Sequence, residues 1–323
     1  MKKYLIIILA AIAPVSVFAD AATDEILGRY NASLGKAQSF CSALPEQIGR
    51  VKLMSGISLG ATAVGTIGGG AAVATGIIKW NNDKKIDGMV DPAVVKARAE
   101  ELQTKAKDRT ITPQEADELV LLAKHIKDDK EKFPQAEKDL KDAKDHSNTM
   151  GNVRTAGAFV SGAGGAVGAA TSLGSLKTLD DLITYMNACD SYVNEIDKQL
   201  MELRFAEPDN PAIAKMNAVV NNCKGMSSKN IADIKGKLKV GGVISAVGGA
   251  AGILGGITSM MAKNGASATG AEGKESTKGL NMAANISSGV ASVGNLGGAI
   301  ISGVALSGLM KNGDIAKKCA ESF

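Results

Sequence analysis

The chain has 323 residues, of which 45% are hydrophobic, only 3% are aromatic and 38 are glycine. Because Phe, Tyr and Trp are scarce, the sequence lacks the usual means of filling a water-soluble core and favours close contact between helix backbones. The 37 basic and 33 acidic residues give a formal charge of +4. This balance excludes the clustered basic excess of a dedicated nucleic-acid-binding protein, so no nucleic acid partner is expected.

Residues 1–19 have the pattern of a signal peptide. Lys2 and Lys3 precede the apolar run 4–12, and Val17-Phe18-Ala19 resembles a small-residue cleavage site. We expect the mature chain to begin at Asp20; an uncleaved anchor helix is the alternative. Export would place the protein in the oxidising part of a bacterial cell envelope, where its four cysteines become disulfide candidates.

Residues 21–53 have apolar residues at helical spacing and predict a helix that kinks or restarts near Pro45. An uncharged segment, 54–78, follows and ends at Lys79-Trp80. A Trp beside a Lys at the end of an apolar run suits a lipid–water boundary. The alternative is a Trp packed on a soluble helix.

A charged arm, residues 81–154, comes next. From Lys79 to Arg154 there are 16 basic and 16 acidic residues. Asp91-Pro92 predicts a helix start, and Thr112-Pro-Gln-Glu115 is a capping box. We expect Pro134 to separate off a further helix that ends near His146. Most of these charges should form a solvated face, with a protein-binding surface as the alternative.

Three more uncharged segments follow, at residues 155–176, 240–262 and 281–310, with a polar loop at 263–278 before the last. The four uncharged segments are called the glycine-rich segments below. In each, small residues recur every four positions, which places them on one helix face. Their predicted helix-packing residues are Gly60, Gly68, Gly76, Gly157, Gly164, Gly165, Gly168, Gly248, Gly252, Gly256, Gly294 and Gly298.

Such rows let helix backbones approach closely, as in small-xxx-small pairs in lipid. The predicted fold is therefore all-α, with two glycine-zipper helical hairpins that span a membrane and a charged helical arm. The expected domains are a first zipper unit, residues 20–205, which includes the arm, and a second, residues 206–323. An internal duplication explains this repeated layout, although Gly/Ala composition could imitate one.

The two cysteines of each hairpin should lie on the same side of it. The layout therefore predicts the disulfides Cys41–Cys189 and Cys223–Cys319 rather than the other pairings.

The glycine-rich segments are long enough to cross a bilayer but only mildly hydrophobic, because Gly, Ser, Thr and Asn contribute little to transfer. They could remain in the inner membrane as two hairpins, insert elsewhere later as an oligomer, or form a soluble bundle. Glycine weakens helices in water, whereas lipid forces the backbone to satisfy its own hydrogen bonds. This difference favours a membrane, with the inner membrane first and the outer membrane or secretion as alternatives.

No catalytic, metal-binding or nucleotide-binding motif occurs, and His125 and His146 lack ligand partners at suitable spacing. We expect a protein without enzyme activity or cofactor. The leading hypothesis is an envelope membrane protein that contacts lipid and forms homo-oligomers through its glycine rows, as a structural component or a pore. The alternative is a secreted, toxin- or effector-like helical protein that inserts into a target membrane or binds a protein through residues 81–154.

Overall fold

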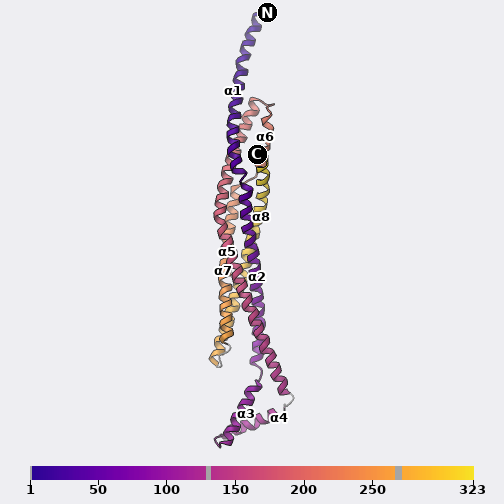
Figure 1. Ribbon diagram of the computed structural model, residues 1–323, viewed down its shortest axis with the longest axis vertical. Coiled ribbons are helices and arrows are strands. Elements are labelled where there is room, and N and C mark those ends of the chain that lie inside the picture. The colour runs from indigo at the N-terminus through magenta and orange to yellow at the C-terminus, as the bar shows by residue number, and fades with distance from the viewer. Residues whose placement is uncertain (1, 129–131, 266–270) are drawn as a thin grey trace. The chain divides into compact units, whose positions relative to one another are not determined.

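The computed structural model describes residues 2–128, 132–265 and 271–323, and within them it contains helices and no strand. The all-α prediction is confirmed. The helices are α1 (Lys2–Cys41), α2 (Leu44–Asp87), α3 (Pro92–Lys107), α4 (Pro113–Asp128), α5 (Lys132–Ala206), α6 (Ala212–Cys223), α7 (Ser228–Gly265) and α8 (Ala271–Ala320). Figure 1 shows α2, α5, α7 and α8 as long ribbons and α3 and α4 as short ones.

The predicted count of four helices plus an arm is not confirmed. Each glycine-rich segment is only one part of α2, α5, α7 or α8. α2 continues into the predicted arm as far as Asp87, and α5 begins inside it at Lys132. A helix does begin beside Pro134, which occupies the first turn of α5, where a proline's missing N–H breaks no helical hydrogen bond. The predicted end near His146 is wrong, because α5 continues to Ala206.

Other helix boundaries follow the sequence signals. α1 ends at Cys41 and α2 starts at Leu44, so the chain restarts its helix beside Pro45. The Asp91 side chain accepts a hydrogen bond from the Ala93 N–H at 2.9 Å and caps α3. Of the predicted polar loop, residues 266–270 lie outside the described part of the chain, and its flanks belong to α7 and α8.

The chain divides into two compact units. Unit 1 comprises residues 1–63, 164–247 and 294–323, and unit 2 comprises residues 64–163 and 248–293. Both units therefore draw on both of the zipper units expected from the sequence. The division into residues 20–205 and 206–323 stays a prediction, as does the signal peptide.

Unit 1 contains a conventional apolar core around the cysteines, which we call the disulfide core. Large side chains fill it, among them Leu44, Ile48, Leu182, Met186 and Ile196, all at most 2% exposed. Phe40 from α1 packs against the Tyr185 and Tyr192 rings of α5, with ring centroids 5.8 and 5.9 Å apart. Here the helices bury their large apolar side chains, as water-soluble bundles do.

Unit 1 also joins the glycine-rich parts of its four long helices. A Cβ at Gly242 of α7 would lie 3.0 Å from the Leu173 side chain of α5, and one at Gly241 would lie 3.0 Å from Ile301 of α8. The Ser58 hydroxyl of α2 contacts the Ser172 hydroxyl of α5 and the Ser302 hydroxyl of α8. Each helix therefore touches two of the others, in the cyclic order α2, α5, α7, α8.

Candidate membrane-facing surface

In unit 2, glycines bring helix backbones into direct contact. A Cβ at Gly68 of α2 would lie 2.7 Å from the carbonyl oxygen of Gly157 in α5. On another side of α5, a Cβ at Gly252 of α7 would lie 2.7 Å from the Gly162 Cα. Real Cβ atoms do not approach this closely, so any larger residue at these positions would push the helices apart.

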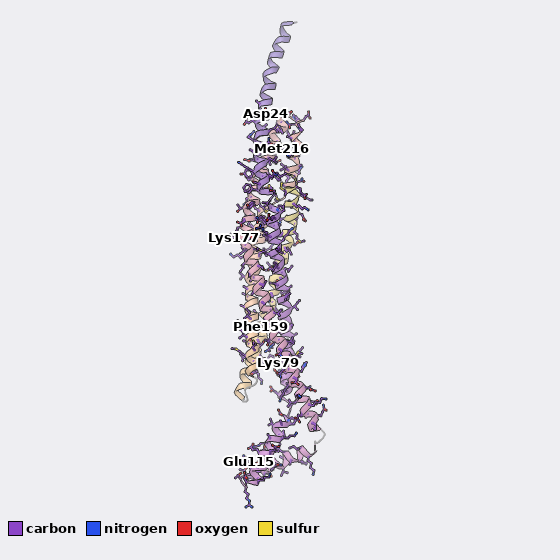
Figure 2. The ribbon with its side chains drawn as sticks, in the orientation of Figure 1. Asp24, Lys79, Glu115, Phe159, Lys177 and Met216 are labelled. Carbon is purple, nitrogen blue, oxygen red and sulfur yellow. A yellow bond between two sulfur atoms is a disulfide. The ribbon has the colours of Figure 1, made fainter. Side chains whose placement is uncertain are left out.

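Most glycines predicted to pack between helices are buried. Gly256 faces the ring of Phe159, which Figure 2 labels, and Gly298 lies against the Ser245 hydroxyl. Gly294 is half-buried. The predicted glycines that are buried are Gly68, Gly76, Gly157, Gly164, Gly165, Gly168, Gly248, Gly252, Gly256 and Gly298.

Gly60 is a correction to the sequence-based set. It is exposed, and a Cβ there would meet nothing within 4 Å. Within this chain Gly60 therefore packs against no neighbouring helix. Residues spaced four apart are rotated progressively around the axis of an α-helix, which has 3.6 residues per turn. Gly60 and Gly68 therefore do not lie on one narrow stripe of the helix surface.

Serine hydroxyls fill the interior of unit 1 beside these glycines. The Ser58 hydroxyl donates to the Gly168 carbonyl at 3.0 Å and lies 2.7 Å from the Ser172 hydroxyl and 3.2 Å from the Ser302 hydroxyl. All three serines are fully buried. Three helices are therefore joined by hydrogen bonds between their side chains rather than by large apolar side chains.

Large apolar side chains along the glycine-rich segments point outward instead. Ile67 on α2, Val247 on α7 and Val293 on α8 are 73%, 56% and 72% exposed. The others that are exposed in these segments are Ile57, Val64, Ile77, Ile78, Phe159, Val160, Val167, Leu173, Val240, Val243, Ile253, Leu254, Ile257, Met260, Met261, Met282, Ile286, Val290, Leu296, Ile300, Val304 and Met310. The segments thus have small or polar residues inside and most of their large apolar residues outside; Leu309, near the end of the last segment, is the exception and is buried in the disulfide core.

Three stretches are long and apolar enough to cross a membrane by length and composition. They lie within Ala21–Lys107, Ala212–Lys263 and Thr277–Ala320 and indicate membrane association. Four spans were expected, and the segment 155–176 of α5 is not among the three found in the described residues. Its Gly, Ser and Thr residues contribute too little to transfer.

One arginine is buried inside unit 2. Arg154 of α5 is 1% exposed and donates hydrogen bonds to the Asn281 side-chain oxygen at 2.7 Å and to that of Asn285 at 3.4 Å. Gly76 of α2 has no side chain and makes room for Asn285, whose amide oxygen a Cβ there would strike. Asn281 and Asn285 therefore provide the polar contacts of a buried cation in an otherwise small-residue interior.

The structure forms the disulfides Cys41–Cys189 and Cys223–Cys319, the pairing that the two-hairpin layout predicted. All four cysteines are buried in the disulfide core. The sulfur atoms of Cys41, Cys189 and Cys319 lie within 4.8 Å of one another. Because each is bonded to another sulfur, they offer no thiolate to a metal.

The charged hairpin of α3 and α4 belongs to unit 2 and packs through its ion pairs. Arg98 of α3 contacts Glu118 of α4 at 2.9 Å, and Lys105 contacts Glu115 at 2.7 Å. Glu115, labelled in Figure 2, also accepts a 2.9 Å hydrogen bond from the Thr112 N–H, so the capping box is confirmed. The Lys105 ammonium and these Thr112 bonds lower the pKa of Glu115 to about 2.

The sequence reasoning missed the serine cluster around Ser58 and the burial of Arg154. Ser172 and Ser302 continue the four-residue rows of Gly164 and Gly168 and of Gly294 and Gly298, and this was the available signal. Ser58 lies outside the row of Gly60, Gly68 and Gly76. Arg154 was taken only as the end of the arm. His146 is exposed, and the side chain of His125 lies outside the described part of the structure.

No protein-family model, curated protein or solved structure matches this chain.

Proposed function

We propose that this chain is a non-enzymatic membrane protein of a bacterial cell envelope, whose helices associate as glycine zippers and which acts as a structural component or a pore. One observation carries the proposal: along the glycine-rich segments the large apolar side chains are outside and glycine and serine are inside. In water this arrangement exposes apolar area and leaves little of it buried. In lipid it places apolar side chains against acyl chains and lets the backbones touch.

The interior of each unit, taken by itself, favours a structural role or a pore between copies over a pore through one copy. Backbone contacts at Gly68–Gly157 and Gly162–Gly252 occupy the space between helices in unit 2.

In unit 1, Gly56 and Gly60 of α2 have no atom within 4 Å of a Cβ built on them. This open face lets a second copy approach closely, so the homo-oligomer is part of the proposal.

Alkaline carbonate extraction of membranes tests this function. We expect the chain to stay in the membrane pellet and to need detergent for release. Complete release into the soluble fraction would contradict the proposal. Separating inner membrane, outer membrane and medium then assigns the compartment, for which the inner membrane is our first expectation.

The second candidate is a secreted protein that binds a partner protein or inserts into a target membrane. The observation that favours it is a set of apolar side chains left exposed on α3, α4 and the turn before α3: Val90, Val94, Val120 and Leu121, which are 64–68% exposed. Recovery of a folded monomer from culture medium would support this candidate and exclude the first.

A further inference from the structure

Every glycine-rich segment is bounded at both ends by a basic residue. The nearest charged residues are Lys52 and Lys79, Arg154 and Lys177, Lys239 and Lys263, and Lys278 and Lys311. The chain has nearly equal numbers of basic and acidic residues, so an unselected arrangement would place acidic residues at about half of these eight positions. The nearest acidic residues, such as Asp83 and Asp180, lie farther from each segment.

In unit 1 the boundary lysines are Lys52, Lys177, Lys239 and Lys311, of which the last three are exposed. None of the four has an ion pair with a described residue of this unit. Of the carboxylates nearby in the sequence, Asp180 pairs with Lys235 and Asp233 pairs with Lys237, and Asp181 and Asp314 form no ion pair with Lys177 or Lys311. Lys177, which Figure 2 labels, is exposed and forms no ion pair with a described residue of this unit.

In unit 2 most of the basic residues at the segment ends form ion pairs or hydrogen bonds with other side chains. Lys79 contacts Asp83 at 2.6 Å, and Arg154 is buried among Asn281 and Asn285. Lys263 is exposed and donates a hydrogen bond to Asn152 at 2.9 Å, and Lys278 is exposed. Three of these four residues are therefore bonded to other side chains of the protein, whereas three of the four boundary lysines of unit 1 are exposed and have no ion pair.

The free lysines of unit 1 adjoin the outward apolar faces. Lys239 precedes Val240 and Val243, which are both exposed, and Lys311 follows the exposed Met310. The shortest segment, residues 155–176, is about 33 Å long as a helix, close to the thickness of a bilayer hydrocarbon core. Lysine side chains at such positions reach to the headgroup layer, where the phosphates lie.

We propose that Lys177, Lys239 and Lys311 bind the phosphate groups of anionic phospholipids that border the apolar faces of unit 1. The inference rests on the proposed membrane function and adds the class of lipid. Three ammonium groups without protein carboxylates are complementary to headgroups with a net negative charge, and an anionic membrane surface attracts each nearby lysine. A zwitterionic headgroup offers no such net charge.

The test uses the full chain reconstituted in vesicles that contain spin-labelled phosphatidylglycerol or spin-labelled phosphatidylcholine. Electron paramagnetic resonance measures the fraction of each lipid that is immobilised at the protein. We expect about a fivefold preference for phosphatidylglycerol at low salt, reduced at high salt. The triple variant Lys177→Gln, Lys239→Gln, Lys311→Gln should lose most of this preference.

The matched control is Lys124→Gln, Lys127→Gln, Lys138→Gln, which removes the same charge from exposed positions of α4 and α5. It should keep the preference. If the wild-type chain inserts but immobilises both lipids equally, the proposed binding of anionic phospholipid is overturned. The proposed membrane function is then unaffected. A chain that inserts into neither vesicle overturns both. If the triple variant does not fold, Lys239→Gln alone and the salt titration of the wild type decide the question.

Discussion

The disulfide core and the glycine-rich segments bury opposite kinds of residue, although the same long helices contribute to both. In the disulfide core, Leu182 and Ile196 are fully buried, while ion pairs such as Arg29–Glu202 lie outside. In the glycine-rich segments, Gly157 and Ser172 are buried while Ile67 and Val293 are exposed. This contrast is the one that the proposed membrane function predicts: water drives large apolar groups inward, whereas in lipid packing and hydrogen bonding join the helices.

The largest expected effect concerns the disulfide core. The two bonds join cysteines 148 and 96 residues apart, so each restricts a long loop in the unfolded chain. Replacing Cys41 and Cys189 together by alanine should lower the free energy of unfolding by about 4 kcal/mol, measured by denaturant titration in detergent. Membrane retention should not change, because the glycine-rich segments carry it. Loss of membrane retention in this variant would show that retention depends on the disulfide core as well as on the glycine-rich segments.

Next in size is Gly252→Leu. The added side chain would meet the Gly162 backbone, and overpacking of this kind costs about 1–3 kcal/mol or more. Thermal unfolding in detergent should show a lower midpoint. Gly70→Leu is the matched control, since Gly70 is exposed and a Cβ there meets nothing within 4 Å, and its midpoint should stay near that of the wild type. Equal effects of the two variants would refute the contact between α5 and α7.

Ser58→Ala should have a smaller effect. It removes the hydroxyl that the Gly168 carbonyl, Ser172 and Ser302 share, and we expect a loss of about 1–2 kcal/mol of unfolding free energy. Thr75→Ala is the control, because Thr75 bonds only to carbonyls of its own helix. A Ser58→Ala protein as stable as the control would mean that hydroxyl bonds do not hold this interior together.

The smallest effect is a pH dependence confined to the α3–α4 hairpin. The pKa of Glu115 is about 2 in the folded chain against an ordinary 4.5, so the ionised form stabilises the hairpin. This contribution is complete above pH 4.5 and is lost as the pH falls from 4.5 towards 2. Hydrogen exchange of residues 92–128 should therefore quicken between pH 4.5 and 2.5, after correction for the intrinsic exchange rate. Glu115→Gln should remove the change; an unaltered profile in that variant would assign it to other groups.

The sequence predicted those parts of the structure that depend on local signals. The cap at Asp91, the capping box at Thr112 and the disulfide pairing all followed from residue type and spacing. The start of a helix beside Pro134 was also predicted, but its end was placed near His146, because the change from charged to glycine-rich sequence there does not interrupt the helix.

Partners across the bundle were harder to predict. Helical spacing places Gly60 and Gly68 near one face but does not say which neighbour each meets, and Gly60 meets none in this chain. Ser58 and Arg154 were read as polar residues that weaken a membrane segment or end one. Only the packing of α2, α5 and α8 shows that they are buried and hydrogen-bonded.

The central claim is that the exposed apolar side chains of the glycine-rich segments face lipid. The most direct test of it uses a single tryptophan as a reporter. In a Trp80→Phe background, one tryptophan is placed at Ile67 or Val293 and, as a control, at Phe205, which is 91% exposed near the disulfide core. In vesicles with brominated lipid, the account predicts quenching by the lipid, but little by aqueous acrylamide, at positions 67 and 293, and the reverse at 205. Strong acrylamide quenching without lipid quenching at 67 and 293 would show that water covers these faces and would contradict the account.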